Sequence, residues 1–250
     1  ILFSDILILP WAMGQSLEFV EGKGPVLGAI RSEQDLAKLD PKRIADVTAP
    51  VLETLTRLNK TLNGSENIGV AQAGATTLLG FTGSPFTVAC YMVEGGGSRE
   101  FAITREMAFS EPALFDRLMA LLTETTATYL CAQIEAGAEA VMLFDSWAGL
   151  LPPSEFRRHV IAPTRQIVQH IKSRHPNVKI IGFPRLGGML VPEYARDTGV
   201  DVVDLHTGAY IALIRDLIFH HVGLQGNLDP SAVLAAGAAR SAESCGGKER

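Results

Sequence analysis

Short runs of aliphatic and aromatic residues recur along the chain, separated by longer stretches whose apolar residues are spaced as on one face of a helix. Most of the short runs are continuously apolar, which is typical of strands that are buried on both faces of a parallel sheet. Six runs are predicted to be strands, at residues 1–7, 76–83, 140–146, 178–183, 200–205 and 222–227.

Helices are expected between these strands. Asp40 followed by Pro41 has the pattern of an N-cap and a first helical residue, and Ser84 followed by Pro85 repeats it. Proline at position 163 should bend or interrupt the helix that contains it. The predicted helices cover 41–62, 110–137, 153–174, 188–198 and 209–218, with a short one after residue 84.

Strands that alternate with helices pair in parallel, either in an open doubly wound sheet or in a closed (β/α)8 TIM barrel. A barrel takes about 250 residues and eight strands. This chain has 250 residues but only about six predicted strands, and it begins with Ile1 in what reads as the middle of a strand. We therefore predict one domain over residues 1–250, a TIM barrel incomplete at both ends, with an open sheet as the alternative.

Composition narrows the functional classes. The chain is 47% hydrophobic with a formal net charge of -5, which argues against nucleic-acid binding. No apolar run approaches the ~18 residues of a membrane span, and no basic segment precedes the apolar start as in a signal peptide. Three cysteines without a Cys-x-x-Cys pair suit a reducing cytoplasm.

Polar residues gather where the predicted strands end, which is where parallel α/β folds build their sites. Asp5 is a lone carboxylate in an apolar run and shares one strand face with Phe3, while Ser146 shares one with Phe144. Each pair places an aromatic ring below a polar group, as in an apolar cleft with a few hydrogen-bonding groups. Alternatively, Asp5 caps the next helix.

Three further residues are candidates. Tyr91 lies in the short helix before a glycine-rich segment, 94–97, that is predicted to act as a lid, although Tyr91 also suits plain packing. Arg185 follows a buried strand and suits an anionic ligand or a surface ion pair. His206 has no second metal ligand at close spacing, so a metal site is not expected there.

Four motifs, in this order and spacing, resemble the uroporphyrinogen decarboxylase family: "ILFSDIL" (1–7), "YMVEGG" (91–96), "FDSWAG" (144–149) and "LQGNLDP" (224–230). The resemblance runs from Ile1 to about Pro230, and "IIGFPR" and "RRHVIAPTRQIV" are most similar to alphaproteobacterial members. It implies a TIM barrel, usually a cytoplasmic homodimer, without metal or organic cofactor. The implied reaction, in heme biosynthesis, removes four acetate carboxyls from uroporphyrinogen III and releases coproporphyrinogen III and four CO2.

By position, Asp5 matches the family aspartate that accepts hydrogen bonds from pyrrole N–H groups, and Tyr91 and Ser146 match substrate-contacting positions. Protonation of a pyrrole ring makes it an electron sink for decarboxylation, and a fixed carboxylate stabilises the resulting positive charge. The family's arginine-bearing segment would precede Ile1 and its histidine segment would follow Arg250, so we expect residues 1–250 alone to turn over weakly or not at all.

The chain departs from the family pattern at Trp11, where an acidic residue is usual, and at 205–210, where "LHTGAY" replaces the usual "LDW". Two other functions therefore stay open. A corrinoid-linked methyltransferase shares the barrel but would want a zinc site, and the residue two after His206 is Gly208 rather than cysteine. A non-catalytic tetrapyrrole binder is the second.

Overall fold

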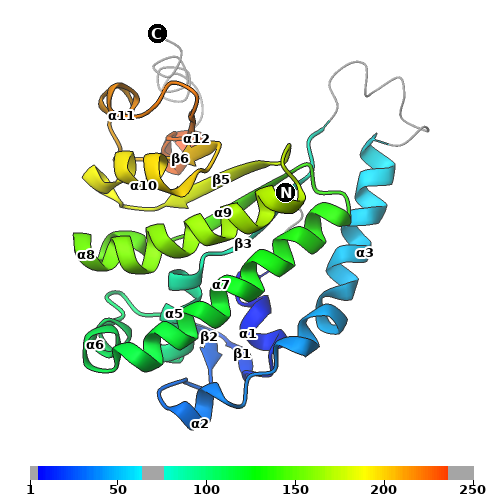
Figure 1. Ribbon diagram of the computed structural model, residues 1–250, viewed down its shortest axis with the longest axis vertical. Helices are drawn as coiled ribbons and strands as arrows, with labels where there is room; N and C mark the ends of the chain where they lie inside the picture. Colours follow the sequence, from blue (N-terminus) through cyan, green and yellow to red (C-terminus); the bar gives the residue numbers. More distant parts are fainter. Residues whose placement is uncertain (1–4, 64–75, 236–250) are drawn as a thin grey trace.

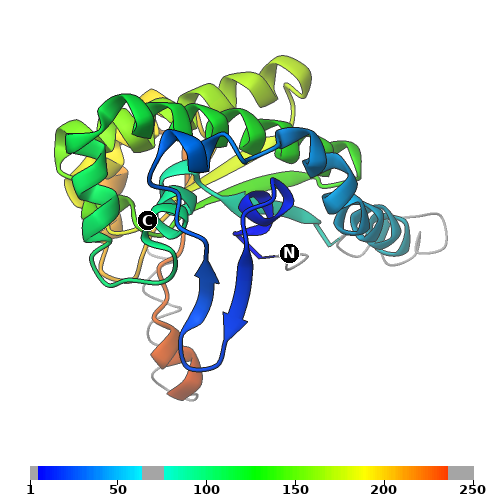
Figure 2. The same cartoon turned by 90° about the horizontal axis from the view of Figure 1, so that it is seen from below.

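The computed structural model describes residues 5–63 and 76–235. Its centre is a parallel sheet with the strand order β3-β4-β5-β6-β7, so each described strand lies beside the next one in the chain. Figure 2 shows helices as a layer over one side of this sheet. The strands are β3 (Leu79–Gly83), β4 (Ala140–Asp145), β5 (Lys179–Pro184), β6 (Val202–Asp204) and β7 (Gly223–Gln225).

The helices predicted between the strands are present, and the segments 8–12, 33–36, 102–110 and 230–235 form further helices that were not predicted. The helices are α1 (Ile8–Ala12), α2 (Glu33–Leu36), α3 (Ile44–Asn63), α5 (Pro85–Glu94), α6 (Ala102–Ser110), α7 (Pro112–Glu135), α8 (Pro153–Phe156), α9 (Ala162–Arg174), α10 (Val191–Thr198), α11 (Ile211–Leu217) and α12 (Pro230–Ala235). Single 3-10 turns lie at η1 (Pro41–Arg43), η3 (Ala148–Leu150) and η5 (Gly188–Leu190). The sequential strand order with a helical layer on one side is the arrangement of a (β/α)8 barrel, incomplete here.

Two predicted helix starts are confirmed and one is wrong. Asp40 caps the turn before α3 by accepting a hydrogen bond from the Lys42 backbone at 3.0 Å, and Ser84 is the N-cap of α5. Ser110, by contrast, is the last residue of α6, and α7 begins two residues later at Pro112. Proline fits the first turn of a helix because its missing N–H would have no partner there.

The predicted helix over 153–174 is interrupted, as its proline indicates. A π-helical turn, η4 (Arg157–Ile161), joins α8 to α9 immediately before Pro163. Because Pro163 has no N–H to donate, the regular hydrogen-bond ladder cannot continue through this point.

The predicted strand over 1–7 is wrong for residues 5–7, and its remainder lies outside the described residues. Here the chain turns and enters α1. The Asp5 carboxylate accepts a hydrogen bond from the Leu7 backbone at 2.7 Å, and the Asp5 carbonyl accepts one from Ile8 at 3.1 Å. Such a local turn competes with strand pairing, which explains the difference.

A β-hairpin that the apolar pattern did not predict follows α1. Its strands, β1 (Leu17–Val20) and β2 (Gly24–Leu27), pair antiparallel and project from the body of the molecule (Figure 2). Gly22 adopts φ +75° in the connecting turn, a conformation that favours glycine. These strands are short and mostly exposed, so they lack the continuous apolar run that marks the strands of the main sheet.

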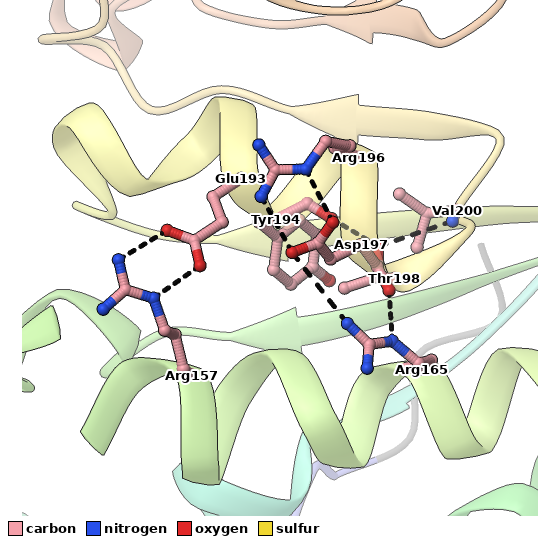
Figure 3. A network of polar contacts seen from close by, with 8 residues as sticks. All are labelled: Arg157, Arg165, Glu193, Tyr194, Arg196, Asp197, Thr198 and Val200. Carbon is pink, nitrogen blue, oxygen red and sulfur yellow. Dashed lines mark hydrogen bonds and ion pairs between the residues drawn. The ribbon is translucent and has the colours of Figure 1, made fainter. Parts of the chain in front are cut away.

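Helix α10 is fastened to the neighbouring helices by ion pairs on the surface (Figure 3). Both nitrogens of one edge of the Arg157 guanidinium donate to the Glu193 carboxylate, at 2.5 and 2.8 Å. Arg165 of α9 donates to the Asp197 backbone carbonyl at 2.5 Å, and within α10 itself Arg196 donates to the Asp197 carboxylate at 2.7 and 2.9 Å. These contacts orient α10 over the sheet, while the buried ring of Tyr194 provides the apolar contact.

Candidate functional site

The face of the sheet opposite the main helical layer is lined by large apolar side chains. Phe81, Met142 and Ile181 form a small buried cluster on it. Phe144 packs edge-on against Phe81 and Phe183, with ring centroids 5.5 and 6.1 Å apart. Phe144 and Phe183 each lie two residues after a member of this cluster, and side chains two residues apart share a strand face. The apolar surface of the inner face therefore extends toward the carboxyl ends of β4 and β5.

Asp5 lies beside this inner face. Its neighbour Ile6 packs against the inner cluster, and a methyl group added to Gly83 at the end of β3 would come within 3.1 Å of the Ile6 side chain. The half-buried Asp5 carboxylate lines a cavity of about 390 Å³ whose other walls are apolar, from Ile8, Trp11, Leu17 and Phe19. No ion pair among the described residues involves Asp5.

The structure shows the capping interpretation of Asp5 in part, whereas its role toward a ligand stays a prediction. One carboxylate oxygen, Oδ1, supports the turn before α1, as a capping residue would. Asp5 also borders a cavity and has no arginine or lysine partner among the residues that the structure describes, so its negative charge is available to a ligand.

Tyr91 extends the site on the α5 side. Its half-buried ring packs edge-on against Phe101 and Trp147, with centroid distances of 5.5 and 6.4 Å. Burial raises the pKa of the Tyr91 hydroxyl above 10.0, the nearby Trp147 indole opposes this, and the negative charge of Asp5 adds to it. Tyr91 thus lies within electrostatic reach of Asp5 and keeps its proton at neutral pH.

Ser146 and Arg185 lie together at the carboxyl ends of β4 and β5. The Arg185 guanidinium donates a 3.4 Å hydrogen bond to the Ser146 backbone carbonyl. The Arg185 backbone N–H donates to the Asp145 backbone carbonyl at 3.1 Å. Arg185 is half-buried and forms no ion pair within the described part of the chain, so the predicted surface ion pair is not found. Phe3 lies outside the described residues.

Asp145, which precedes Ser146, has a different role from the one its place at a strand end suggests. It points to the helical side of β4 and is 1% exposed. Thr87 on α5 donates a 2.7 Å hydrogen bond to one carboxylate oxygen, and the Trp147 backbone N–H donates to the same Thr87 hydroxyl at 3.2 Å. The other oxygen, Oδ2, has no partner among the described residues. Burial raises the pKa of Asp145 from 3.8 to about 7, and the hydrogen bonds from Thr87 limit the rise.

A second carboxylate that the sequence analysis did not select lies on the inner face. Asp204 ends β6 two residues after Val202, which packs against the inner cluster. Burial raises its pKa above 3.8, while hydrogen bonds from Gln225 and the Leu205 backbone oppose this. The signal for it was strand parity, because Asp204 lies two residues after Val202 and shares its face of β6.

The glycine-rich segment after α5 pairs with the hairpin. Gly95 ends α5 with φ +86°, its carbonyl accepts a 3.0 Å hydrogen bond from Leu27, and Gly96 bridges Val26 of β2. The predicted free lid is therefore a docked connection, which links the Tyr91 helix to the hairpin that carries Phe19.

The family model "Uroporphyrinogen decarboxylase (URO-D)" matches residues 1–245. The chain belongs to the uroporphyrinogen decarboxylase family. It is 67% identical to a uroporphyrinogen decarboxylase of Gluconacetobacter diazotrophicus over 97% of this chain and 69% of the relative. It is 64% identical to one of Gluconobacter oxydans over 95% of this chain and 65% of the relative. The chain thus spans about two thirds of their length, and the family resemblance seen in the motifs is confirmed.

A solved structure of a methyltransferase from Methanosarcina mazei has the same fold, with a TM-score of 0.73 at 18% identity. The match covers 99% of this chain and 71% of the methyltransferase. At this low sequence identity it supports the barrel-type fold alone. Within the described residues, no helix is long and apolar enough to cross a membrane.

Proposed function

We propose that this chain carries the decarboxylation site of a uroporphyrinogen decarboxylase in heme biosynthesis. The enzyme removes the four acetate carboxyls of uroporphyrinogen III and yields coproporphyrinogen III and four CO2. Family membership and 67% identity to a decarboxylase support the reaction. The observation that carries the site is the Asp5 carboxylate, without an ion-pair partner among the described residues, at the edge of an otherwise apolar cavity.

Decarboxylation of an acetate side chain requires an acceptor for the electron pair of the breaking C–C bond. A proton added to a pyrrole carbon makes the ring that acceptor, CO2 leaves, and the remaining methylene takes up a proton to become methyl while the ring loses its added proton. The ring nitrogen carries positive charge between these steps. A carboxylate fixed beside the nitrogen stabilises that charge most where water is excluded, so it acts more on the transition state than on the substrate.

Asp5 meets these requirements. Its Oδ1 is held by the Leu7 backbone at 2.7 Å, so the carboxylate is positioned before the ligand arrives. The apolar walls from Ile8, Leu17 and Phe19 offer few polar groups to the carboxylate, so a ligand that covers the cavity displaces water and interacts more strongly with the Asp5 charge. Pyrrole N–H groups are donors, and hydrogen bonds to a charged acceptor contribute about 1.5–3 kcal/mol each. Asp5 keeps its negative charge throughout and transfers no proton.

The substrate carries eight carboxylates, and the chain is itself acidic with a formal net charge of -5. Local cations must therefore hold the substrate. Arg185, which forms no ion pair in the described part of the chain, binds one of these carboxylates beside Ser146. Tyr91 supplies a protonated hydroxyl to the substrate, and Phe144 supplies apolar contact. Phe3, outside the described residues, is retained as a substrate-binding candidate.

Assembly and location follow from the family. We infer a cytoplasmic homodimer with a single barrel domain that includes residues 1–250, and no metal or organic cofactor. Measurement of mass in solution by light scattering tests the dimer, and a monomer at micromolar concentration contradicts it.

Asp5→Asn tests the site, because the two side chains have the same shape and differ in charge. The chain and its variants are incubated with uroporphyrinogen III without oxygen, and the products are separated by carboxyl number. We expect Asp5→Asn to bind about tenfold or more weakly and to lose any turnover by at least about 100-fold. Asp216→Asn, on an exposed position of α11, is the matched control and should change neither. Equal affinity of Asp5→Asn and the parent would refute the proposal and would favour a non-catalytic tetrapyrrole binder.

A further inference from the structure

Trp11 lines the Asp5 cavity, although its family position is usually acidic. It is the only residue of α1 that is not buried: the helix buries Ile8, Leu9, Pro10 and Ala12, while Trp11 stays 50% exposed. Burial of a large aromatic ring is favourable by about 25 cal/mol per Å² of apolar surface. Half of the Trp11 side-chain surface therefore stays in contact with water, and its burial by a ligand would be favourable.

The position of Trp11 relative to Asp5 is set by the local backbone. The Ile8 backbone N–H donates to the Asp5 carbonyl at 3.1 Å, and the Trp11 backbone N–H donates to the Leu7 carbonyl at 3.2 Å. Asp5, Ile8 and Trp11 are thus spaced by three residues along a turn and a helix, which places their side chains on one side. All three line the same cavity.

A second aromatic ring comes to this cavity from a separate element. Phe19 of β1 is 66% exposed and shares one strand face with Leu17, which is also a wall of the cavity. Single exposed apolar residues are common on protein surfaces and need no ligand. Here two exposed aromatic rings from α1 and β1 border one cavity together with an unpaired carboxylate, and this combination indicates a flat ligand with N–H donors.

We propose that the Trp11 indole stacks on the pyrrole ring whose N–H is bound by Asp5, and that it stabilises the ring further when the ring is protonated. This inference rests on the proposed function. An indole face attracts a cation, and the attraction grows when water is excluded. The uncharged pyrrole gains only stacking, whereas the protonated ring gains both, so Trp11 contributes to turnover as well as to affinity.

The size of the cavity supports a contact with one ring at a time. Its volume of about 390 Å³ is near the lower end of the range of small-molecule sites, roughly 300–1,000 Å³. That volume suits one pyrrole with its two acidic side chains better than a whole macrocycle. The remaining rings then lie outside this cavity.

The chain has two tryptophans, Trp11 and Trp147, so 5-fluorotryptophan labelling should give two ¹⁹F resonances, and Trp11→Phe assigns them. Titration with uroporphyrinogen III under reducing conditions is expected to shift the Trp11 resonance more than the Trp147 resonance. The unligated Trp147 resonance also reports whether each variant is folded, because this residue packs against Phe101 with a centroid distance of 4.8 Å.

Substitutions separate the aromatic face from simple apolar contact. We expect Trp11→Phe to bind within about threefold of the parent, and Trp11→Ala to bind at least about tenfold more weakly. Trp11→Leu keeps an apolar side chain without a ring face and should reduce turnover by a larger factor than it reduces affinity. An unmoved Trp11 resonance on binding, or unchanged affinity of Trp11→Ala, overturns this inference alone. Failure of the parent chain to bind overturns the proposed function together with it.

Discussion

The buried carboxyl of Asp145 leads to a prediction about stability and pH. In the folded chain its pKa is raised from 3.8 to about 7 because the group is fully buried, and no cation among the described residues compensates its charge. Between about pH 4 and pH 7 the folded state therefore retains a proton that the unfolded state has lost. Stability from this group is fully present at low pH and is lost as the pH rises toward 7.

The size of the effect follows from the two pKa values. At about 1.4 kcal/mol per pH unit, the difference between 3.8 and about 7 corresponds to about 4 kcal/mol. Asp145→Asn removes the ionisation while keeping the shape of the side chain and an oxygen that accepts from Thr87. At about pH 4 the variant and the parent should have similar free energies of unfolding, and by pH 8 the variant should be more stable by up to about 4 kcal/mol.

Urea denaturation followed by circular dichroism measures this difference at a series of pH values. The comparison of variant with parent at each pH cancels every other titrating group. Asp216→Asn, which is exposed on α11, is the control and should give a difference near zero throughout. A difference between Asp145→Asn and the parent that stays constant from pH 4 to pH 8 would refute the argument, because it would mean that the carboxyl ionises alike in both states.

Two further substitutions test the packing behind the site. Gly182→Ala should destabilise the fold by about 2–4 kcal/mol, because the added Cβ would lie within 3.0 Å of the Tyr194 ring. Gly97 has open space around it, so the control Gly97→Ala should cost under about 1 kcal/mol. The same urea denaturation measures both. Gln133→Leu should lower the free energy of unfolding by about 2–3 kcal/mol, because Gln133 accepts from the Phe81 backbone N–H at 2.9 Å and donates to the Phe81 carbonyl at 3.0 Å. Amide hydrogen exchange at β3 should become faster in this variant, and unchanged exchange would contradict the prediction.

The apolar pattern alone located the five described strands of the main sheet to within a few residues. This works because strands buried on both faces need continuous apolar runs, which few other elements have. The same pattern predicted the break near Pro163, since the missing N–H of proline acts locally. Motif order and spacing identified the family, and with it the reaction.

The apolar pattern did not predict the hairpin or the turn at Asp5. Strand β1 buries none of its side chains and β2 buries only Leu27, so no periodic signal marks them. The turn at Asp5 results from a side-chain hydrogen bond to the Leu7 backbone, which an apolar sequence does not reveal. Yet these two elements bring Trp11 and Phe19 to the same cavity as Asp5.

Local sequence patterns were sufficient to locate the five described strands of the main sheet, the family and the candidate carboxylate at position 5. Which polar groups line the cavity and which are buried in the core depends on the folded arrangement. Asp145 and Ser146 are neighbours in one motif, but the end of β4 turns Asp145 toward Thr87 and the helices. The physical reason is strand parity, since a shift of one residue moves a side chain to the opposite face of the sheet.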